Sequence, residues 1–255
     1  MLLTVDVGNT NVTLGLFEGQ TIRATFRMTT KMQRTSDEFG SQVAEMLTRK
    51  GIKVKEITDV IISSVVPKVM YSLISGIIKY FNIEPIVVGP GTKTGITIKR
   101  VDPREVGSDR IVDAVAAYHE VGGACIVMDF GTATTIDLIG PEGTFDAGVT
   151  CPGIAISAQS LWDQTARLPE IEIKKTSTIL AKDTITSMQA GVFFGQIGQA
   201  EYIIKKMKEE CGYDDVTVIA TGGLGRIIYE NSDCIDIYDN ELTLKGMRLI
   251  FEKNK

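Results

Sequence analysis

The sequence contains little histidine, little cysteine and no cluster of basic residues. Its 255 residues include one histidine and four cysteines, and 27 lysine and arginine residues face 32 aspartate and glutamate residues, a formal net charge of −5. A single histidine excludes mechanisms that need two and argues against Ser-His-Asp hydrolysis. An acidic chain without clustered lysine and arginine is not typical of proteins that bind nucleic acid.

The cysteines lack the spacing of a metal site or a disulfide framework. They stand at positions 125, 151, 211 and 234, with no Cys-x-x-Cys pair and no histidine cluster beside them. Zinc sites and disulfide-rich scaffolds both use closer, paired spacing. We therefore expect four reduced thiols and no zinc.

Long hydrophobic runs are also missing. The apolar stretches 60–67 and 73–81 are much shorter than the roughly 18 residues that a membrane helix needs. The first residues show no basic segment followed by an apolar core, as a signal peptide would. With 44% hydrophobic residues, the chain can still bury a sizeable core. The sequence therefore predicts a globular cytoplasmic protein that binds neither membrane nor nucleic acid.

The first half of the chain reads as a meander followed by alternating helices and strands. β-branched and aromatic residues separated by turns predict strands over 2–7, 12–17 and 22–28. Thr35 and Glu38 form the pattern of a capping box, which predicts a helix over about 36–50. Further along, the patterns predict a strand, a helix and a strand over 59–64, 67–81 and 83–88.

The second half repeats this order after a helix over about 109–118 that ends at a glycine pair. Strands are predicted over 125–129, 134–139, 144–149, 217–220 and 234–238, and helices over 154–164, 183–208, 224–229 and 242–251. The residues around Asp6 match those around Asp129, each in Asp-x-Gly after a strand, and the offset is 129 − 6 = 123. We expect two related halves, 1–121 and 122–255, from duplication of a β-β-β-α unit.

Each of these Asp-x-Gly turns carries groups that suit a nucleoside triphosphate. The carboxylate can hold hydrated Mg²⁺, and the glycine lets the backbone approach a phosphate closely, where amide N–H groups and Asn or Thr side chains donate hydrogen bonds. Two such turns could clamp a nucleotide. In phosphoryl transfer a protein mainly positions groups and neutralises charge, so the lack of a second histidine is no obstacle.

Other nucleotide motifs fail on spacing. Lys93-Thr94 has no glycine directly before the lysine, so it is not a P-loop. Asp129-Phe130-Gly131 spells the metal triplet of protein kinases, but no His-Arg-Asp accompanies it. The glycines at 222, 223 and 225 come too late in the chain for a dinucleotide fingerprint.

A second cluster, Gly107-Ser108-Asp109-Arg110, stands just before a predicted helix. Asp109 could be no more than a helix N-cap. It could also be a base that takes a hydroxyl proton, with the Arg110 guanidinium holding an anionic substrate group. The sequence leaves both readings open.

Four motifs follow one another along the chain: Asp-x-Gly-Asn-Thr-Asn at 6–11, Gly-Pro-Gly-x-Lys-Thr-Gly-Ile at 89–96, Gly-Ser-Asp-Arg at 107–110, and Asp-Phe-Gly-Thr-Ala-Thr-Thr at 129–135. With these motifs in this order, the chain resembles the type III pantothenate kinases. The resemblance implies the fold of the actin-like acetate and sugar kinase superfamily, an α/β fold with two duplicated ribonuclease-H-like domains of mixed β-sheets flanked by helices. It also implies ATP-dependent phosphorylation of the 4′-hydroxyl of pantothenate, the first step of coenzyme A biosynthesis.

The resemblance also implies roles for residues. Asp6 resembles the Mg²⁺ ligand, and Asp109 and Arg110 resemble the base and a pantothenate contact within the substrate segment that includes Gly107 and Ser108. The positions that the resemblance implies for phosphate binding are Asp6, Val7, Gly8, Asn9, Thr10, Asn11, Val12, Thr13 and Thr132. Asp129 resembles the ligand of K⁺ or NH₄⁺, and Thr184 resembles a threonine that reaches substrate from the other subunit of a homodimer. The segment 89–96 resembles part of the pantothenate pocket.

Two alternatives to a pantothenate kinase are left open. One is a nucleotide-binding accessory or regulatory protein of the same fold with little transferase activity. The other is a sugar or carboxylate kinase of the same superfamily. An ADP-release assay with a panel of acceptors separates these alternatives from a pantothenate kinase. The acidic residues also predict that turnover requires Mg²⁺ and a monovalent cation.

Overall fold

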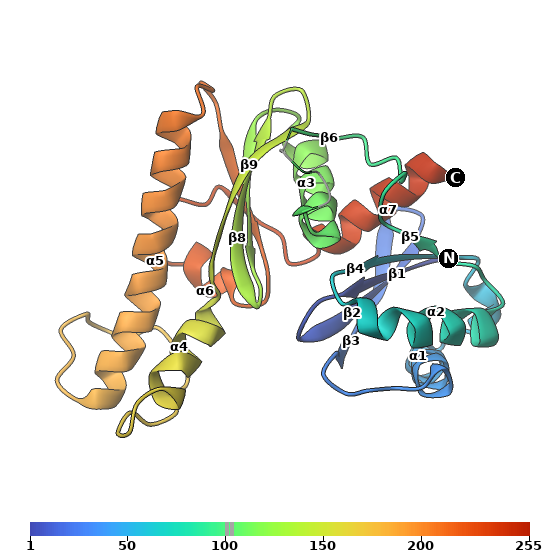
Figure 1. The fold of residues 1–255 in the computed structure, drawn as a ribbon, viewed down its shortest axis with the longest axis horizontal. Helices are drawn as coiled ribbons and strands as arrows, with labels where there is room; N and C mark the ends of the chain where they lie inside the picture. The colour runs from blue at the N-terminus through green and yellow to red at the C-terminus, as the bar shows by residue number, and fades with distance from the viewer. Residues whose placement is uncertain (100–101, 103–104) are drawn as a thin grey trace. The chain divides into compact units, whose positions relative to one another are not determined.

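The computed structural model describes residues 1–99, 102 and 105–255, which form two compact units. The first unit comprises Met1–Ile96, the described residues of 101–116, and Leu242–Lys255. The second comprises Thr97–Lys99 and Ala117–Glu241. Each unit is built on its own β-sheet (Figure 1).

The first unit has a five-stranded sheet in the order β3-β2-β1-β4-β5. Its strands are β1 Leu2–Val7, β2 Asn11–Glu18, β3 Thr21–Thr29, β4 Asp59–Ser64 and β5 Ile86–Val87. β1, β2 and β3 pair antiparallel, whereas β4 runs parallel to β1 and β5 parallel to β4. The predicted meander is confirmed, followed by a crossover to the other edge of β1.

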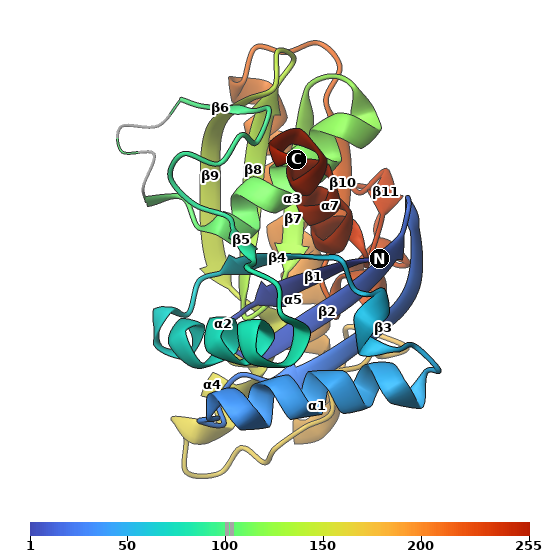
Figure 2. The same cartoon turned by 90° about the vertical axis from the view of Figure 1, so that its right-hand side faces the viewer.

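Helices cover both faces of this sheet. On one face, helices α1 (Ser36–Arg49) and α2 (Pro67–Phe81) lie side by side and pack on Leu3, Val5 and Val7 (Figure 2). On the other face, α7 (Leu242–Asn254) and the first part of α3 (Ser108–Val121) pack around Leu2. A short 3₁₀ helix, Val54–Glu56, precedes β4.

The start of α1 confirms the capping box. The Glu38 N–H donates to the Thr35 hydroxyl at 3.3 Å, and the Thr35 N–H donates to the Glu38 carboxylate at 2.7 Å. Two of the N–H groups that a helix start leaves unpaired are thereby satisfied.

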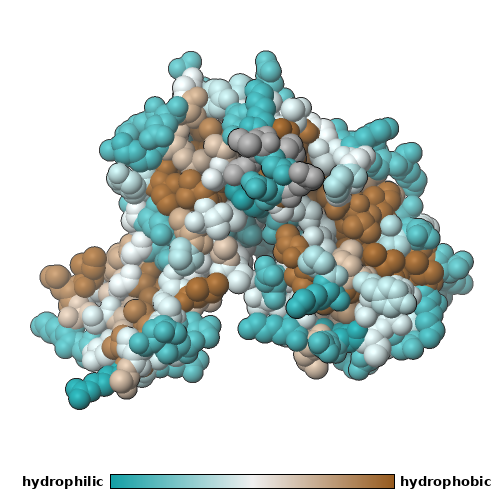
Figure 3. Space-filling model, viewed as in Figure 1, coloured by the Kyte–Doolittle hydropathy of each residue, from teal (hydrophilic) through white to brown (hydrophobic). Residues whose placement is uncertain are grey.

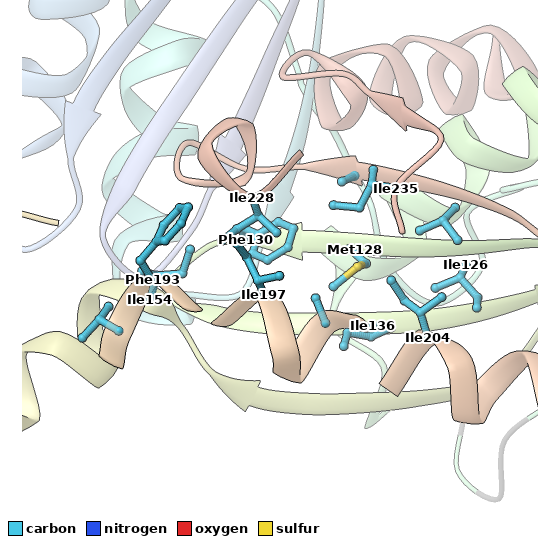
Figure 4. Packing of buried hydrophobic residues seen from close by; sticks show 14 of the residues in the cluster. Ile126, Met128, Phe130, Ile136, Ile154, Phe193, Ile197, Ile204, Ile228 and Ile235 are labelled. Atoms are coloured by element: carbon cyan, nitrogen blue, oxygen red, sulfur yellow. The ribbon is translucent and has the colours of Figure 1, made fainter. Parts of the chain in front are cut away.

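The second unit has a six-stranded sheet in the order β11-β10-β7-β8-β9-β6. Its strands are β6 Thr97–Ile98, β7 Cys125–Phe130, β8 Ala133–Gly140, β9 Thr144–Pro152, β10 Thr217–Thr221 and β11 Ile237–Tyr238, and its helices are α4 Ile154–Asp163, α5 Thr184–Glu210 and α6 Gly225–Tyr229. Figure 4 shows Ile126, Met128 and Phe130 of β7 in the same buried cluster as Phe193 and Ile197 of α5.

The duplication predicted from the sequence is visible strand by strand. β1 and β7 both have six residues with the same order of buried and half-buried positions, and β2 and β8 both have eight. The pairing of the second strand with the third is irregular at Leu16/Phe17 in one unit and at Leu138/Ile139 in the other. These features confirm the α/β fold of two mixed sheets flanked by helices. The sequence boundary at 121/122 stays a prediction; α7 lies with the first unit.

The structure differs from the predictions mainly in short elements. The strands predicted over 83–88 and 234–238 are only two residues long, and β6 lies in a stretch for which no strand was predicted. The cysteines are free thiols, as predicted, with Cys125 buried. No helix in the described ranges combines the length and the apolar character that crossing a membrane requires.

Candidate functional site

Asp6 lies near the end of β1, on the face of the sheet that α3 and α7 cover. Its cross-strand neighbours are Thr13 on β2 and Ser63 on β4. Because side chains alternate along a strand and Val5 and Val7 point to α1 and α2, Asp6 points to the opposite face. Thr13 and Ser63 share that face with it.

The predicted phosphate-binding residues 6–13 span the end of β1, a tight turn and the start of β2. Val7 and Val12 pair across the turn and are buried, and the Gly8 N–H donates to the Asn11 carbonyl at 3.0 Å. Asn9 and Thr10, at the tip, are exposed. The turn therefore has a buried base and a tip that a ligand can reach.

Ser108, the first residue of α3, joins the helix to the end of β4. Its hydroxyl donates to the Ser64 carbonyl at 3.0 Å, and it accepts from the Ser64 N–H and from the Ser63 hydroxyl, both at 3.1 Å. One donor and two acceptor positions are all that a serine hydroxyl has. Since Ser63 is the strand neighbour of Asp6, this network holds the start of α3 beside Asp6. Sequence reasoning did not single out Ser63, which reads as the end of a buried strand.

Asp109 lies in the first turn of α3, one residue after the helix begins, so the simple N-cap reading is wrong. Its Oδ1 accepts from the Arg110 N–H at 2.8 Å. Burial raises the pKa of the Asp109 carboxyl, and the hydrogen bond from the Arg110 backbone partly opposes this. A raised pKa makes the carboxylate a stronger proton acceptor. Gly107 makes room for it, because a Cβ there would lie 2.4 Å from Asp109 Oδ1.

The helix α7 supports two of the predicted motifs. Gly246 packs against α3, where an added Cβ would lie 2.1 Å from the Val112 carbonyl oxygen. At the far end of α7, Asn254 accepts from the Lys93 N–H at 3.0 Å and donates to the Lys93 carbonyl at 2.9 Å. These contacts lie eight residues apart on α7, roughly 12 Å at 1.5 Å per residue. The segment 89–96 is therefore attached to the C-terminal end of α7, about two turns away from the place where α7 packs on α3.

In the second unit, Asp129 occupies the position in β7 that Asp6 has in β1. Its cross-strand neighbours are Thr135 on β8 and Thr221 on β10. Two glycines bracket the carboxylate, because a Cβ at Gly222 would lie 2.7 Å from Asp129 Oδ1 and one at Gly131 would lie 3.0 Å from Oδ2. Gly222 has φ +93°, which favours glycine.

The sequence offered Gly222 only as part of a failed dinucleotide fingerprint. A glycine directly after a strand that is parallel to the strand of Asp129 is the signal that could have placed it. The Tyr238 hydroxyl donates to the Gly222 carbonyl at 2.9 Å, which fixes this turn beside the carboxylate.

The remaining predicted site residues also lie in the second unit. Thr132 follows Asp129 in the turn between β7 and β8. Gly153, at the start of α4, packs closely against Thr132, because a Cβ at Gly153 would lie 2.2 Å from the Thr132 carbonyl oxygen. Thr184 is exposed and is the first residue of α5, whose N-cap Asp183 accepts from the Thr186 N–H at 3.0 Å. Thr184 is thus held at a capped helix start.

The carboxylates fit cations that are held partly by substrate. Within 1–99, 102 and 105–255, no group of three or more His, Cys, Asp or Glu side chains could hold a metal by itself. Mg²⁺ in kinases commonly takes one or two carboxylates plus phosphate oxygens and water, which fits Asp6 beside the exposed turn. A side chain at Gly131 or Gly222 would crowd the Asp129 carboxylate, and the lack of one suits a cation with carboxylate and carbonyl ligands.

Structural comparison places the fold among known proteins. The chain matches a protein from Campylobacter jejuni described as a Baf family transcriptional activator with a TM-score of 0.60 and 20% identity, over 99% of this chain and 98% of that one. It matches a protein from Sinorhizobium meliloti described as a 2-dehydro-3-deoxygalactonokinase with a TM-score of 0.56 and 13% identity, over 99% and 96%. At these identities the likeness shows the fold alone.

Sequence comparison is more specific. The family model described as type III pantothenate kinase matches residues 2–206. A type III pantothenate kinase of Agathobacter rectalis is 58% identical over 253 residues, which cover 99% of this chain and 97% of the relative. Both matches include the turn at Asp6, the Gly-Ser-Asp-Arg segment and the turn at Asp129. The chain therefore belongs to the type III pantothenate kinase family.

Proposed function

We propose that the protein transfers the γ-phosphoryl group of ATP to the 4′-hydroxyl of pantothenate, the first step of coenzyme A biosynthesis. Family membership supports the reaction. The observation that carries it is the Ser63–Ser108 hydrogen bond at 3.1 Å, which holds the segment of Asp109 beside the strand neighbour of Asp6. A proton acceptor and a phosphate turn on one face of one sheet are what a kinase needs to bring acceptor and nucleotide together.

Asp109 is the general base in this proposal, and Arg110 holds the carboxylate of pantothenate. Asp109 Oδ1 is occupied by the Arg110 N–H, so we assign proton transfer to Oδ2. Gly107 and Ser108 shape the substrate segment: the glycine leaves room for the Asp109 carboxylate, and the serine hydroxyl fixes the start of α3. The segment 89–96 contributes to the pantothenate pocket.

The turn from Asp6 to Thr13 binds the phosphates of ATP. Asp6 engages Mg²⁺, while Gly8, Asn9, Thr10 and the strand residues on either side present backbone and side-chain donors. When bound, the ion neutralises charge on the transferred phosphoryl group. This role is supported by the turn itself, whose tip is exposed while the strand residues that carry it, Val7 and Val12, are buried.

Asp129 is the ligand of K⁺ or NH₄⁺ and Thr132 contacts a nucleotide phosphate. The lack of side chains at Gly131 and Gly222, beside the Asp129 carboxylate, supports the cation proposal. The closeness of Thr132 to the start of α4 supports the phosphate contact, since helix N-termini favour anions.

Thr184 reaches substrate from the other subunit of a homodimer. Three large apolar side chains close to Thr184 in the sequence are exposed, which supports an assembly. They are Ile179, Leu180 and Ile185. Figure 3 shows hydrophobic residues gathered over the end of the second unit that carries the segment between α4 and α5. Such surfaces commonly mark interaction sites. We place the enzyme in the cytoplasm, with ATP and pantothenate as its substrates.

A coupled assay of ADP formation tests the reaction. We expect turnover to require pantothenate, Mg²⁺ and K⁺ or NH₄⁺ together. Pantothenate-independent ADP release, or release that only a sugar or another carboxylate supports, would sink the proposal. Tight ATP binding with no turnover of any acceptor would instead support the accessory protein.

A further inference from the structure

Thr30, directly after β3, holds both ends of the turn that follows β1. It is 6% exposed. Its N–H donates to the Thr10 carbonyl at 2.9 Å, and its hydroxyl donates to the Gly8 carbonyl at 2.7 Å. One buried residue therefore fixes two carbonyls that lie on either side of Asn9.

The direction of these carbonyls sets the direction of two amide N–H groups. In a trans peptide, the C=O of one residue and the N–H of the next point opposite ways, and the described residues contain no cis peptide bond. With the Gly8 carbonyl directed at Thr30, the Asn9 N–H points away from Thr30. Because the Thr10 carbonyl is directed at Thr30, the Asn11 N–H also points away from Thr30.

We propose that Thr30 is a positioning residue for nucleotide binding, which aims the Asn9 and Asn11 N–H groups at a phosphate of ATP. The inference rests on the proposed phosphate-binding role of this turn. Backbone N–H groups on one side of a turn can bind an anion together, and they are most effective when they need no reorganisation on binding. Thr30 touches no phosphate and acts only through the turn.

The repeat offers an independent comparison. With the offset of 123 between the halves, the position equivalent to Thr30 is Gly153, again the first residue after the third strand. Gly153 packs against the carbonyl oxygens of Gly131 and Thr132, where a Cβ would lie 2.6 and 2.2 Å away. In both units, the residue after the third strand supports the turn after the first. Only the first unit uses a side-chain hydrogen bond to do so.

The test removes the hydroxyl and nothing else. Thr30→Val keeps the branched shape and the backbone N–H, Thr30→Ser keeps the hydroxyl, and Thr30→Ala repeats the loss should the valine variant not fold. The matched control is Thr4→Val, because Thr4 is fully buried in the same sheet and its hydroxyl donates to the Gly15 carbonyl at 3.1 Å. Binding of Mg²⁺ with a non-hydrolysable ATP analogue is measured by calorimetry, alongside KM for both substrates and Tm.

We expect Thr30→Val to weaken binding of the analogue and raise KM for ATP about tenfold, the scale of one lost hydrogen bond to a positioned group. KM for pantothenate should stay within twofold. Thr30→Ser should bind the analogue as tightly as wild type does. Thr4→Val should lower Tm without weakening binding of the analogue.

Two results overturn the inference: Thr30→Val binding the analogue as tightly as Thr4→Val, or Thr30→Ser binding it as weakly as Thr30→Val. Calorimetry needs no turnover. A wild-type protein that binds the analogue but does not phosphorylate pantothenate would contradict the proposed function, while the Thr30 comparison would still be decided by binding.

Discussion

Replacing Gly246 by alanine tests whether α7 sets the position of the proposed base. Gly246 is buried on α7, and the new Cβ would lie 2.1 Å from the Val112 carbonyl oxygen and 2.9 Å from Val112 Cγ1. Ordinary contacts begin at 3.4 Å, so α3 and α7 must separate by about 1.3 Å (3.4 − 2.1). A backbone oxygen within a helix cannot rotate away as a side chain can.

The displacement reaches Asp109 because Val112 lies about one turn further along the same helix. A misplacement of about 1 Å at a reacting group can cost roughly 10²-fold in rate. We therefore expect kcat to fall roughly 100-fold, while KM for ATP changes little because the turn after β1 is not moved. Overpacking should also cost about 1–3 kcal/mol of folding free energy, a Tm decrease of about 2–4 °C per kcal/mol for a chain of this size.

A matched control separates displacement of α3 from general instability. Gly76→Ala makes the same kind of clash, 2.5 Å from the Ser36 carbonyl oxygen, between α1 and α2 on the opposite face of the sheet. Both variants are assayed by ADP release at a temperature where circular dichroism shows them folded. Equal kcat for Gly246→Ala and Gly76→Ala would refute the reasoning, since the rate would then follow stability and not the position of α3.

Three further substitutions address the site. Asp109→Asn should lower turnover by roughly 10²–10⁴-fold yet raise Tm at pH 7. Burial raises the pKa of this carboxyl in the folded state, so its ionisation opposes folding above its ordinary pKa, and the gain in Tm should shrink as the pH falls toward 3.8. A lower Tm of the variant at pH 7 would contradict this. Ser63→Ala removes one hydrogen bond to Ser108 and should cost about 1 kcal/mol in urea unfolding and lower kcat several-fold, whereas unchanged kcat would show that the start of α3 is held without it. Asp129→Asn should raise the K⁺ concentration for half-maximal turnover at least tenfold in a salt titration, and an unchanged titration would remove Asp129 from the cation site.

The regular elements were predictable because their signals are local. The capping box at Thr35 and Glu38 fixes where α1 begins, and strands of six to nine residues are long enough to show alternation. The two-residue strands were harder: β5 and β11 lie within longer predicted strands, and β6 was not predicted, since a pair of residues carries no period. Their place in the sheets is set by neighbouring strands, as β6 is by β9.

The site residues that sequence reasoning missed depend on contacts between distant parts of the chain. Ser63 meets Ser108 across 45 positions, and Thr30 meets Gly8 across 22. Neither side chain stands out in its local sequence, because Ser63 is the next-to-last residue of a buried strand and Thr30 follows an edge strand. Only the register of β4 against β1 and the path of the chain after β3 bring these hydroxyls to the motifs. Asp109, in contrast, was found by motif, and the structure shows that it is not the N-cap.

The duplication explains why two similar turns can do different work. Asp6 and Asp129 occupy equal positions in equal strands, so the fold supplies a carboxylate and an Asp-x-Gly turn in each unit whatever the later specialisation. The difference lies in what surrounds them. In the first unit, a serine on the neighbouring strand holds the start of the helix that carries the proposed base, and a threonine makes hydrogen bonds to the turn. In the second unit, the equivalent places hold Thr221 and Gly153, and the residues closest to the carboxylate include two glycines. A hydrogen-bonded turn beside a base suits the reacting phosphate and the acceptor, whereas a glycine-lined carboxylate suits an ion that only balances charge.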